Sequence, residues 1–266
     1  MAMEVTRTAD GLATSTITVS TRPIVQQDWT PVWSFHTDVD LSANEGSTVE
    51  LIRQRDSAWV FVNRLSDNPR QLFRGDHPLM FDGARLLNGQ WSKWIPPCRD
   101  GLPAMIGVIA PTPADLLALC TPVMNTDAPD SNKDVHLIVS HDAGMSYTDA
   151  GVVSGYWASF AAAFTPDDIV LSTSSGPGTD PVLRTTHDGG RHWDTSYTPP
   201  STRTYDAGYV TFGGDGSLSG DRGFLPGSQA YLIETTRRRD GPVYYRTRLL
   251  MTRDTGRSWT AIPFPL

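Results

Sequence analysis

Short apolar runs alternate with turn-forming residues along this sequence. Residues 48–52 and 58–62 flank one such turn. Residues 84–87 run into a second turn at Asn88-Gly89, and an Asn-Gly pair between two apolar runs is a strong local signal for a β-hairpin. The pattern therefore predicts short antiparallel strands joined by tight turns.

An eight-residue pattern occurs three times without gaps, at residues 140–147, 186–193 and 252–259. Its shared form is Ser/Thr-x-Asp-x-Gly-x-x-Trp/Tyr, and each copy lies between two β-prone stretches. The hydroxyl and the carboxylate can accept hydrogen bonds from N–H groups of the turn, while glycine adopts the positive φ of a tight reversal. The pattern predicts three strand-turn-strand corners. Their shared acidic and glycine residues are Asp142, Gly144, Asp188, Gly190, Asp254 and Gly256.

These three copies resemble the Asp-box, or BNR, repeat of sialidases and related β-propellers. The resemblance covers residues 100–266 directly and extends to the rest of the chain by extrapolation. In that family the boxes are structural and lie away from the active site. The resemblance therefore implies that the three aspartates form turns and are not catalytic.

The spacing of the copies predicts the size of the structural unit. The box aspartates are 46 and then 66 residues apart, which suits a four-stranded blade of about 46 residues with an insertion of about 20 in the last blade. We expect an all-β fold, a single-domain β-propeller of about five four-stranded blades. The expected blades are residues 12–47 as a partial blade, 48–97, 102–153, 156–200 and 205–266.

Composition agrees with this fold class and argues against a nucleic-acid partner and a membrane span. The 266 residues include 23 Gly and 20 Pro with only 19% charged residues, which favours many turns and short elements. A net charge of −7 provides no attraction to phosphates, so we expect no nucleic-acid partner. We also expect no membrane span, because no run of about 18 apolar residues occurs. Only Lys93 and Lys133 are lysines, and this arginine bias is typical of an actinobacterial-type genome.

The two cysteines, Cys98 and Cys120, allow two interpretations. They could form a disulfide that ties the end of one blade to an inner strand of the next, or remain thiols in a reducing compartment. Residues 1–20 contain no uninterrupted apolar segment of a signal peptide. We expect a secreted or cell-surface protein whose signal has been removed, with a cytoplasmic location as the alternative.

Antiparallel blades place their connections on two faces. The turns between the first and second strands and between the third and fourth strands share one face, which the boxes mark. The longer loops should emerge on the opposite face, where binding groups concentrate around the funnel of a propeller. These loops are residues 66–80, 121–134, 174–181, 195–208 and 236–243.

Candidate site residues lie in or near these loops. We expect Arg74 and Arg237 to anchor polar or anionic groups and the aromatic residues to form a stacking wall. The expected aromatic residues are Tyr156, Trp157 and Tyr205. His77 is the candidate acid/base, and Tyr231 with Glu234 is the remaining catalytic candidate.

The resemblance to sialidases is incomplete at this site. Sialidases combine an arginine triad, a Tyr and Glu pair and an acid/base Asp. This sequence has no recognisable Phe-Arg-Ile-Pro segment, and the chain is short for six blades. Tyr231 and Glu234 are three residues apart, so a regular strand directs them to opposite faces. A true sialidase is therefore not expected.

No cofactor and no metal is expected, because the sequence lacks clustered His or Cys ligand spacing, a nucleophile elbow and a phosphate loop. We expect a ligand-binding propeller that recognises a carbohydrate, either glycoside-hydrolase-like or lectin-like. One alternative is a biosynthetic enzyme, such as a cyclase or isomerase, that binds a small apolar molecule in the funnel. The other is a non-catalytic scaffold or assembly factor, so catalysis itself is left open.

Overall fold

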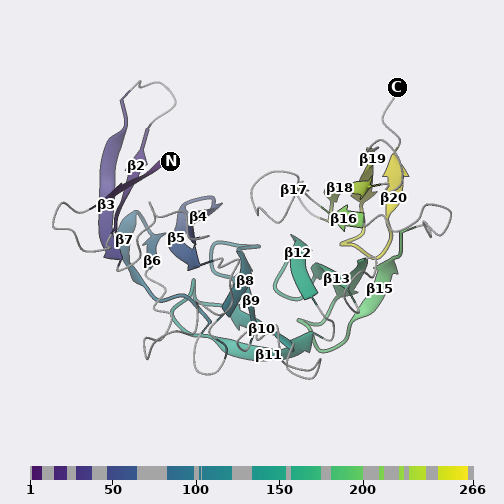
Figure 1. The fold of residues 1–266 in the computed structure, drawn as a ribbon. Helices are drawn as coiled ribbons and strands as arrows, with labels where there is room; N and C mark the ends of the chain where they lie inside the picture. The colour runs from purple at the N-terminus through teal and green to yellow at the C-terminus, as the bar shows by residue number, and fades with distance from the viewer. Residues whose placement is uncertain are drawn as a thin grey trace, which may run out of the picture. The chain divides into compact units, whose positions relative to one another are not determined.

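The computed structural model describes residues 2–7, 15–22, 28–37, 47–64, 83–98, 102, 104–121, 134–153, 157–174, 181–199, 210–212, 222–224, 228–237 and 245–262. Within these ranges every regular element is a β-strand, and the strands form five antiparallel sheets (Figure 1). The prediction of an all-β chain is confirmed for this part of the molecule. The same ranges contain no helix long and apolar enough to cross a membrane.

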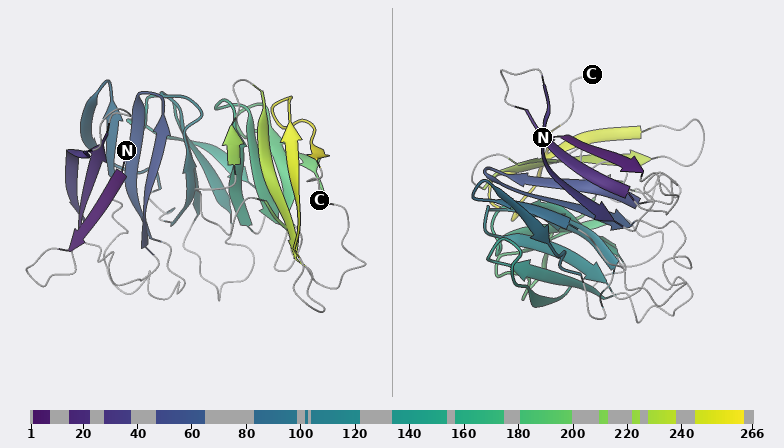
Figure 2. Two further views of the ribbon diagram at one scale, coloured as in Figure 1. Left: turned by 90° about the horizontal axis from the view of Figure 1, so that it is seen from above. Right: turned by 90° about the vertical axis from the view of Figure 1, so that its left-hand side faces the viewer.

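Strands that follow one another in the chain lie side by side in sheets 1 to 4 (Figure 2). Sheet 1 comprises β1 (Ala2–Arg7), β2 (Ser15–Thr21) and β3 (Thr30–Thr37). Sheet 2 comprises β4 (Ser47–Gln54), β5 (Ser57–Arg64), β6 (Gly83–Leu87) and β7 (Gln90–Trp94). Sheet 3 comprises β8 (Ala104–Ile109), β9 (Leu116–Thr121), β10 (Val135–Ser140) and β11 (Thr148–Val153).

Sheets 4 and 5 complete the described structure. Sheet 4 comprises β12 (Trp157–Ala163), β13 (Ile169–Ser174), β14 (Val182–Thr186) and β15 (Asp194–Tyr197). Sheet 5 comprises β16 (Val210–Phe212), β17 (Arg222–Phe224), β18 (Ala230–Arg237), β19 (Tyr245–Thr252) and β20 (Thr260–Ile262), with both β16 and β17 paired to β18. Four-stranded antiparallel sheets of this kind are consistent with propeller blades.

β1 lies before residue 12, where the first expected blade begins. It pairs with β2 from Ala2↔Ser20 to Arg7↔Ser15. The sequence Ala-Met-Glu-Val-Thr-Arg has a single strong apolar β-former, Val5, so its own pattern is too weak to mark a strand. The hydrogen-bonded pairing with β2 therefore stabilises a strand that the local sequence does not predict.

The chain divides into two compact units, and the expected single domain stays a prediction. The first unit contains Met1–Pro97 with Ala143–Met145, and the second contains Cys98–Asp142 with Ser146–Leu266. In the first unit, Ile17 and Val19 of β2 pack with Val60 and Val62 of β5. The buried indole of Trp59 donates to the carbonyl oxygen of Ala143 at 3.1 Å.

The described residues of the second unit include two apolar clusters. One includes Leu119, Leu137, Phe160 and Leu171 and fills the space between sheets 3 and 4. The other joins sheets 4 and 5. Its residues include Val170, Leu183, Leu232 and Leu250. Each sheet of this unit is therefore held to its neighbour mainly by apolar side chains.

The three repeated turns have the same hydrogen bonds. In each, the first hydroxyl donates to the aspartate Oδ1 at 2.8 Å, and that oxygen also accepts a backbone N–H from four residues further on, at 2.8 to 3.0 Å. The glycines Gly144, Gly190 and Gly256 have φ of 83°, 96° and 86°. Each carboxylate is thus engaged by its own turn.

Two of these glycines also sit against the preceding sheet. A Cβ on Gly190 would lie 2.8 Å from Leu137 Cδ2, and one on Gly256 would overlap Val170 Cγ2. The carbonyl oxygen of Gly256 accepts from Thr185 Oγ1 at 3.1 Å. Glycine is needed here both for its φ and for the close approach of the sheets.

A second turn recurs between the first and second strands of sheets 3 and 4. Thr112 Oγ1 accepts from the backbone N–H of Asp115 at 3.0 Å, and Thr165 Oγ1 accepts from that of Asp168 at 2.9 Å. His141, in the first repeated turn, lies 2.8 Å from Asp115 through Nδ1. His187 pairs with Asp168 at 2.7 Å in the same way. Both kinds of turn therefore lie at one edge of sheets 3 and 4. The edge of a sheet that carries its tight turns is called the turn edge below.

Cys98 and Cys120 form a disulfide, with an S–S distance of 2.05 Å and a Cα–Cα distance of 5.4 Å. Both cysteines are buried. Cys98 lies before β8 and Cys120 within β9, so the bond holds the segment entering sheet 3 against an inner strand. The disulfide interpretation is the one that the structure adopts.

Candidate functional site

Half of the predicted site residues fall outside the described part of the chain. These are Arg74, His77, Tyr156 and Tyr205. Trp157 is the first residue of β12, and Arg237 is the last residue of β18. Their binding roles stay predictions. Tyr231 and Glu234 lie within β18, where side-chain burial is described.

β18 directs Tyr231 and Glu234 to opposite faces. Along the strand Ala230, Leu232 and Glu234 are buried, whereas Tyr231 and Ile233 are half-buried. Pairing with β19 runs without a shift from Ala230↔Thr252 to Arg237↔Tyr245, so the alternation is unbroken. Glu234 is therefore not the partner of Tyr231, in agreement with the argument from strand alternation.

Glu234 belongs instead to a cluster with Tyr197 and Arg248, called the Tyr–Glu–Arg cluster. Tyr197 donates its hydroxyl to Glu234 Oε2 at 2.6 Å. Arg248 donates from Nη2 to Glu234 Oε1 at 2.6 Å and from Nε to Oε2 at 3.0 Å. Its Nη2 also lies 2.9 Å from the Tyr197 hydroxyl oxygen. Tyr197 ends β15 of sheet 4, and the other two form a cross-strand pair of sheet 5.

Burial and charge fix the protonation of two of these groups. The Glu234 side chain is 2% exposed and that of Arg248 is 22% exposed. Burial, with the hydrogen bond to Glu234, raises the pKa of Tyr197 well above its ordinary value. The hydrogen bond to Glu234 likewise raises the pKa of Arg248. At neutral pH Tyr197 is a hydrogen-bond donor, not a phenolate nucleophile.

A β-bulge brings Tyr197 into this cluster. β14 pairs through Leu183↔Tyr197 and Arg184↔Thr195, which leaves Ser196 as the extra residue. A bulge redirects the side chains that follow it. As a result both Ser196 and Tyr197 contact sheet 5, because Ser196 Oγ accepts from Trp259 Nε1 at 3.2 Å while Tyr197 reaches Glu234.

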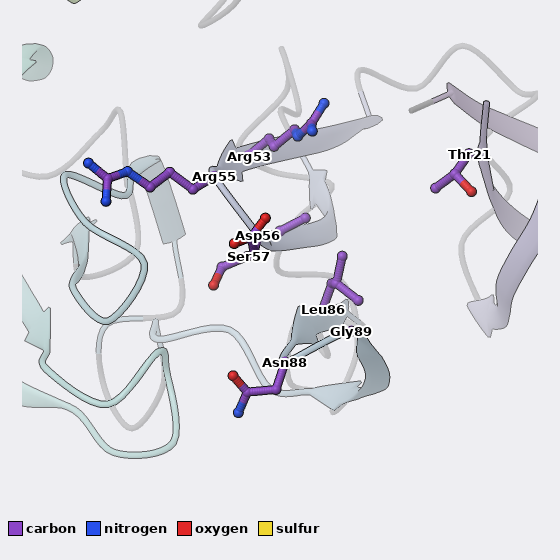
Figure 3. A pocket seen from close by; sticks show the side chains of 9 residues that line it. Thr21, Arg53, Arg55, Asp56, Ser57, Leu86, Asn88 and Gly89 are labelled. Carbon is purple, nitrogen blue, oxygen red and sulfur yellow. The ribbon is translucent and has the colours of Figure 1, made fainter. Parts of the chain in front are cut away.

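The first unit contains a pocket of about 520 Å³ at the turn edge of sheet 2. It is lined by Arg53 near the end of β4, by residues of the β4–β5 and β6–β7 turns, including Arg55 and Asn88, and by Thr21 of β2 (Figure 3). The side chains of Arg53 and Arg55 extend in different directions (Figure 3). This arrangement does not converge on a single anionic group.

Tyr197 and Arg248 were missed by sequence reasoning. One usable signal is the position of Glu234, which shares the buried side of β18 with Ala230 and Leu232. An acid at such a position needs a cationic or donating partner, and Arg248 lies in the next strand. Tyr197 had no comparable signal, because its contact depends on the bulge at Ser196. In the ranges that the structure describes, no three His, Cys, Asp or Glu side chains form a metal-binding group.

No protein-family model matches this sequence, and no curated protein does. Similar solved structures include a protein of unknown function from Dyadobacter fermentans, 15% identical over 99% of this chain and 82% of that one, with a TM-score of 0.48. Trypanosoma rangeli sialidase is 11% identical over 80% of this chain and 37% of its own, with a TM-score of 0.41. Prolyl oligopeptidase B from Galerina marginata is 11% identical over 85% of this chain and 27% of its own, with a TM-score of 0.39.

Proposed function

We propose that this chain is a β-propeller whose three repeated turns are Asp boxes, and that it binds a glycan at the edge of the sheets opposite those turns. The observation that carries the proposal is the common turn edge. The repeated turns hydrogen-bond alike, and two of them are joined to first-to-second-strand turns by His141 and His187. Connections between the second and third strands therefore emerge at the other edge.

The proposed ligand contacts come from that other edge. Arg74 and Arg237 are the proposed anchors for polar or anionic groups, and Tyr156, Trp157 and Tyr205 the proposed stacking wall. His77 is proposed to complete the site. Tyr231 does not belong to it, because this second residue of β18 pairs with Met251 beside the third repeated turn and so lies at the turn edge. Trp157 begins β12 and Arg237 ends β18, which is consistent with a position at this edge.

Recognition is favoured over hydrolysis. A nucleophilic tyrosine must lose its proton to attack, but the raised pKa of Tyr197 keeps its hydroxyl protonated. Glu234 has both carboxylate oxygens occupied by Arg248 and Tyr197. This Tyr and Glu pair is therefore not arranged as a nucleophile and its base, and the proposal does not rely on hydrolysis.

A glycan array compares the two edges directly. Wild-type protein should bind a subset of glycans, and joint Arg74→Ala and Trp157→Ala substitution should weaken this binding at least about tenfold, because an anchor and a stacking surface are both lost. Joint Arg53→Ala and Arg55→Ala substitution, at the turn edge, is the matched control and should leave binding unchanged. The proposed edge is wrong if the control variant loses binding and the first variant does not.

We further propose a secreted or cell-surface location. The supporting observation is the Cys98–Cys120 disulfide, because such bonds persist mainly in oxidising compartments. Mass spectrometry after blocking of free thiols, on protein isolated from its native compartment, should detect no blocked cysteine. Two blocked thiols would contradict this location.

A further inference from the structure

The Tyr–Glu–Arg cluster is not part of the structural repeat. In sheets 4 and 5 the first residue of each box pairs with the first residue of the preceding strand. The pairs are Thr186↔Ile169 of β13 and Thr252↔Ala230 of β18. Four residues away from the box, sheet 5 has the pair Glu234↔Arg248. The pair at the same place in sheet 4 is Thr173↔Val182, which carries no charge.

Tyr197 also lacks a counterpart in the preceding sheet. β11 has a bulge at the same distance from its box, with pairs Leu137↔Gly151 and Ile138↔Asp149. Its extra residue, Ala150, matches Ser196, and Gly151 then matches Tyr197. The contact between sheets 3 and 4 is therefore made without the phenol, the carboxylate or the guanidinium.

Stability alone does not account for this cluster. Removing two charges from water is costly, and apolar residues of similar volume at such positions are often equally stable or more so. In this same chain, sheets 3 and 4 are held together by an apolar contact that includes Leu119, Leu137 and Phe160. The hydrogen-bonded Tyr–Glu–Arg cluster differs from an apolar contact because its hydrogen bonds are directional and form in only one relative placement of the three side chains.

We infer that Tyr197, Glu234 and Arg248 form a polar lock that fixes the placement of β18 and β19 against β15. Tyr197 packs against the apolar cluster that contains Leu183, Leu232 and Leu250, and apolar contacts of this kind would tolerate sliding of one sheet on the other. Three donor contacts of 2.6 to 3.0 Å on one carboxylate oppose such sliding. Since Arg237 is the last residue of β18, the lock also positions one proposed ligand contact, and this clause rests on the proposed function.

Spectrophotometric titration of the phenols tests the chemistry of the lock. Burial and the hydrogen bond to Glu234 raise the pKa of Tyr197, so its phenol should ionise in a separate transition at a pH above that of a free phenol. Tyr197→Phe should remove this late transition, whereas Tyr147→Phe, the same loss of one hydroxyl in the first box, should keep it. Glu234→Gln should bring it to lower pH. An identical titration of Tyr197→Phe and Tyr147→Phe would overturn the lock.

Amide hydrogen exchange tests the positioning role. Tyr197→Phe keeps the packed ring and should raise exchange in β18 and β19 by about tenfold, with β9 and β10 unchanged. An equal rise in every sheet would mean a general loss of stability and would refute a local lock. If the wild-type protein binds no glycan on the array, the proposed function fails, while the titration and the exchange pattern still decide the lock.

Discussion

Trp193 buries an indole N–H that has no hydrogen-bond partner among the described residues. The corresponding tryptophan of the next repeated turn, Trp259, donates its N–H to Ser196 Oγ at 3.2 Å. Ser196 is the bulged residue of sheet 4, and its counterpart in sheet 3 is Ala150, which packs in the same cluster as Trp193. Ala150→Ser should therefore provide the missing acceptor.

The expected change in the free energy of unfolding corresponds to one hydrogen bond from a buried indole N–H. A net hydrogen bond contributes about 0.5 to 1.5 kcal/mol, so Ala150→Ser should stabilise the protein by about 1 kcal/mol, or about 2 to 4 °C in Tm for a chain of this size. The reverse change, Ser196→Ala, leaves the Trp259 N–H without its acceptor and should destabilise by about 1 to 3 kcal/mol. Urea unfolding followed by tryptophan fluorescence measures both changes.

A double-mutant cycle isolates the new bond. In a Trp193→Phe background the donor is absent, so Ala150→Ser should no longer stabilise the protein. The reasoning is refuted if Ala150→Ser destabilises the wild type, or if it stabilises both backgrounds equally. Either result would mean that the bulged position of sheet 3 does not present its side chain to the indole nitrogen.

Other predictions concern the turns and the disulfide. Gly256→Ala should destabilise by about 2 to 4 kcal/mol in urea unfolding, from positive φ plus overlap with the preceding sheet, whereas Gly89→Ala, at φ 76° with no described atom within 4 Å, should lose only about 1 kcal/mol. Burial raises the pKa of Asp254, but hydrogen bonds from Ser258 and Thr252 outweigh it and hold the pKa below its ordinary value. The folded state then binds this proton less readily than the unfolded chain, so stability should fall as the pH drops below about 4, and Asp254→Asn should flatten that fall in unfolding curves at stepped pH. Reduction of the disulfide, which closes a loop of 22 residues, should lower stability by about 3 kcal/mol in calorimetry, and unchanged stability would contradict this loop-entropy argument.

The repeated turns were predictable because all their interactions are local. A hydroxyl, a carboxylate and a glycine within eight residues satisfy one another wherever the rest of the chain lies, so spacing alone specifies the corner. The two faces of β18 were predictable for a similar reason, since strand alternation separates Tyr231 from Glu234 without reference to any other strand. Local rules therefore predict turns and faces well.

Contacts between sheets were not predictable in this way. The partner of Glu234 depends on a one-residue bulge at Ser196, and a bulge leaves no clear mark in a sequence of small polar residues. The cysteine spacing allowed both a bond and free thiols, and only the Cα–Cα distance of 5.4 Å distinguishes them. β1 was missed because its register comes from β2 and not from its own pattern.

The position of the cluster within its strands separates it from the turn chemistry. β18 starts at the turn edge with Ala230 and ends at the other edge with Arg237, and Glu234 lies beyond its midpoint. Tyr197 is the last residue of β15, which likewise starts directly after the second repeated turn. The repeated hydroxyl, carboxylate and glycine residues thus lie at the turn edge, where each tight turn needs the same backbone hydrogen bonds. The Tyr–Glu–Arg cluster lies toward the other edge, where the described residues of the sheets share no such turn. Under the proposed function, substitutions of Trp157 and Arg237, at the ends of β12 and β18 away from the turns, should alter binding more than the free energy of unfolding.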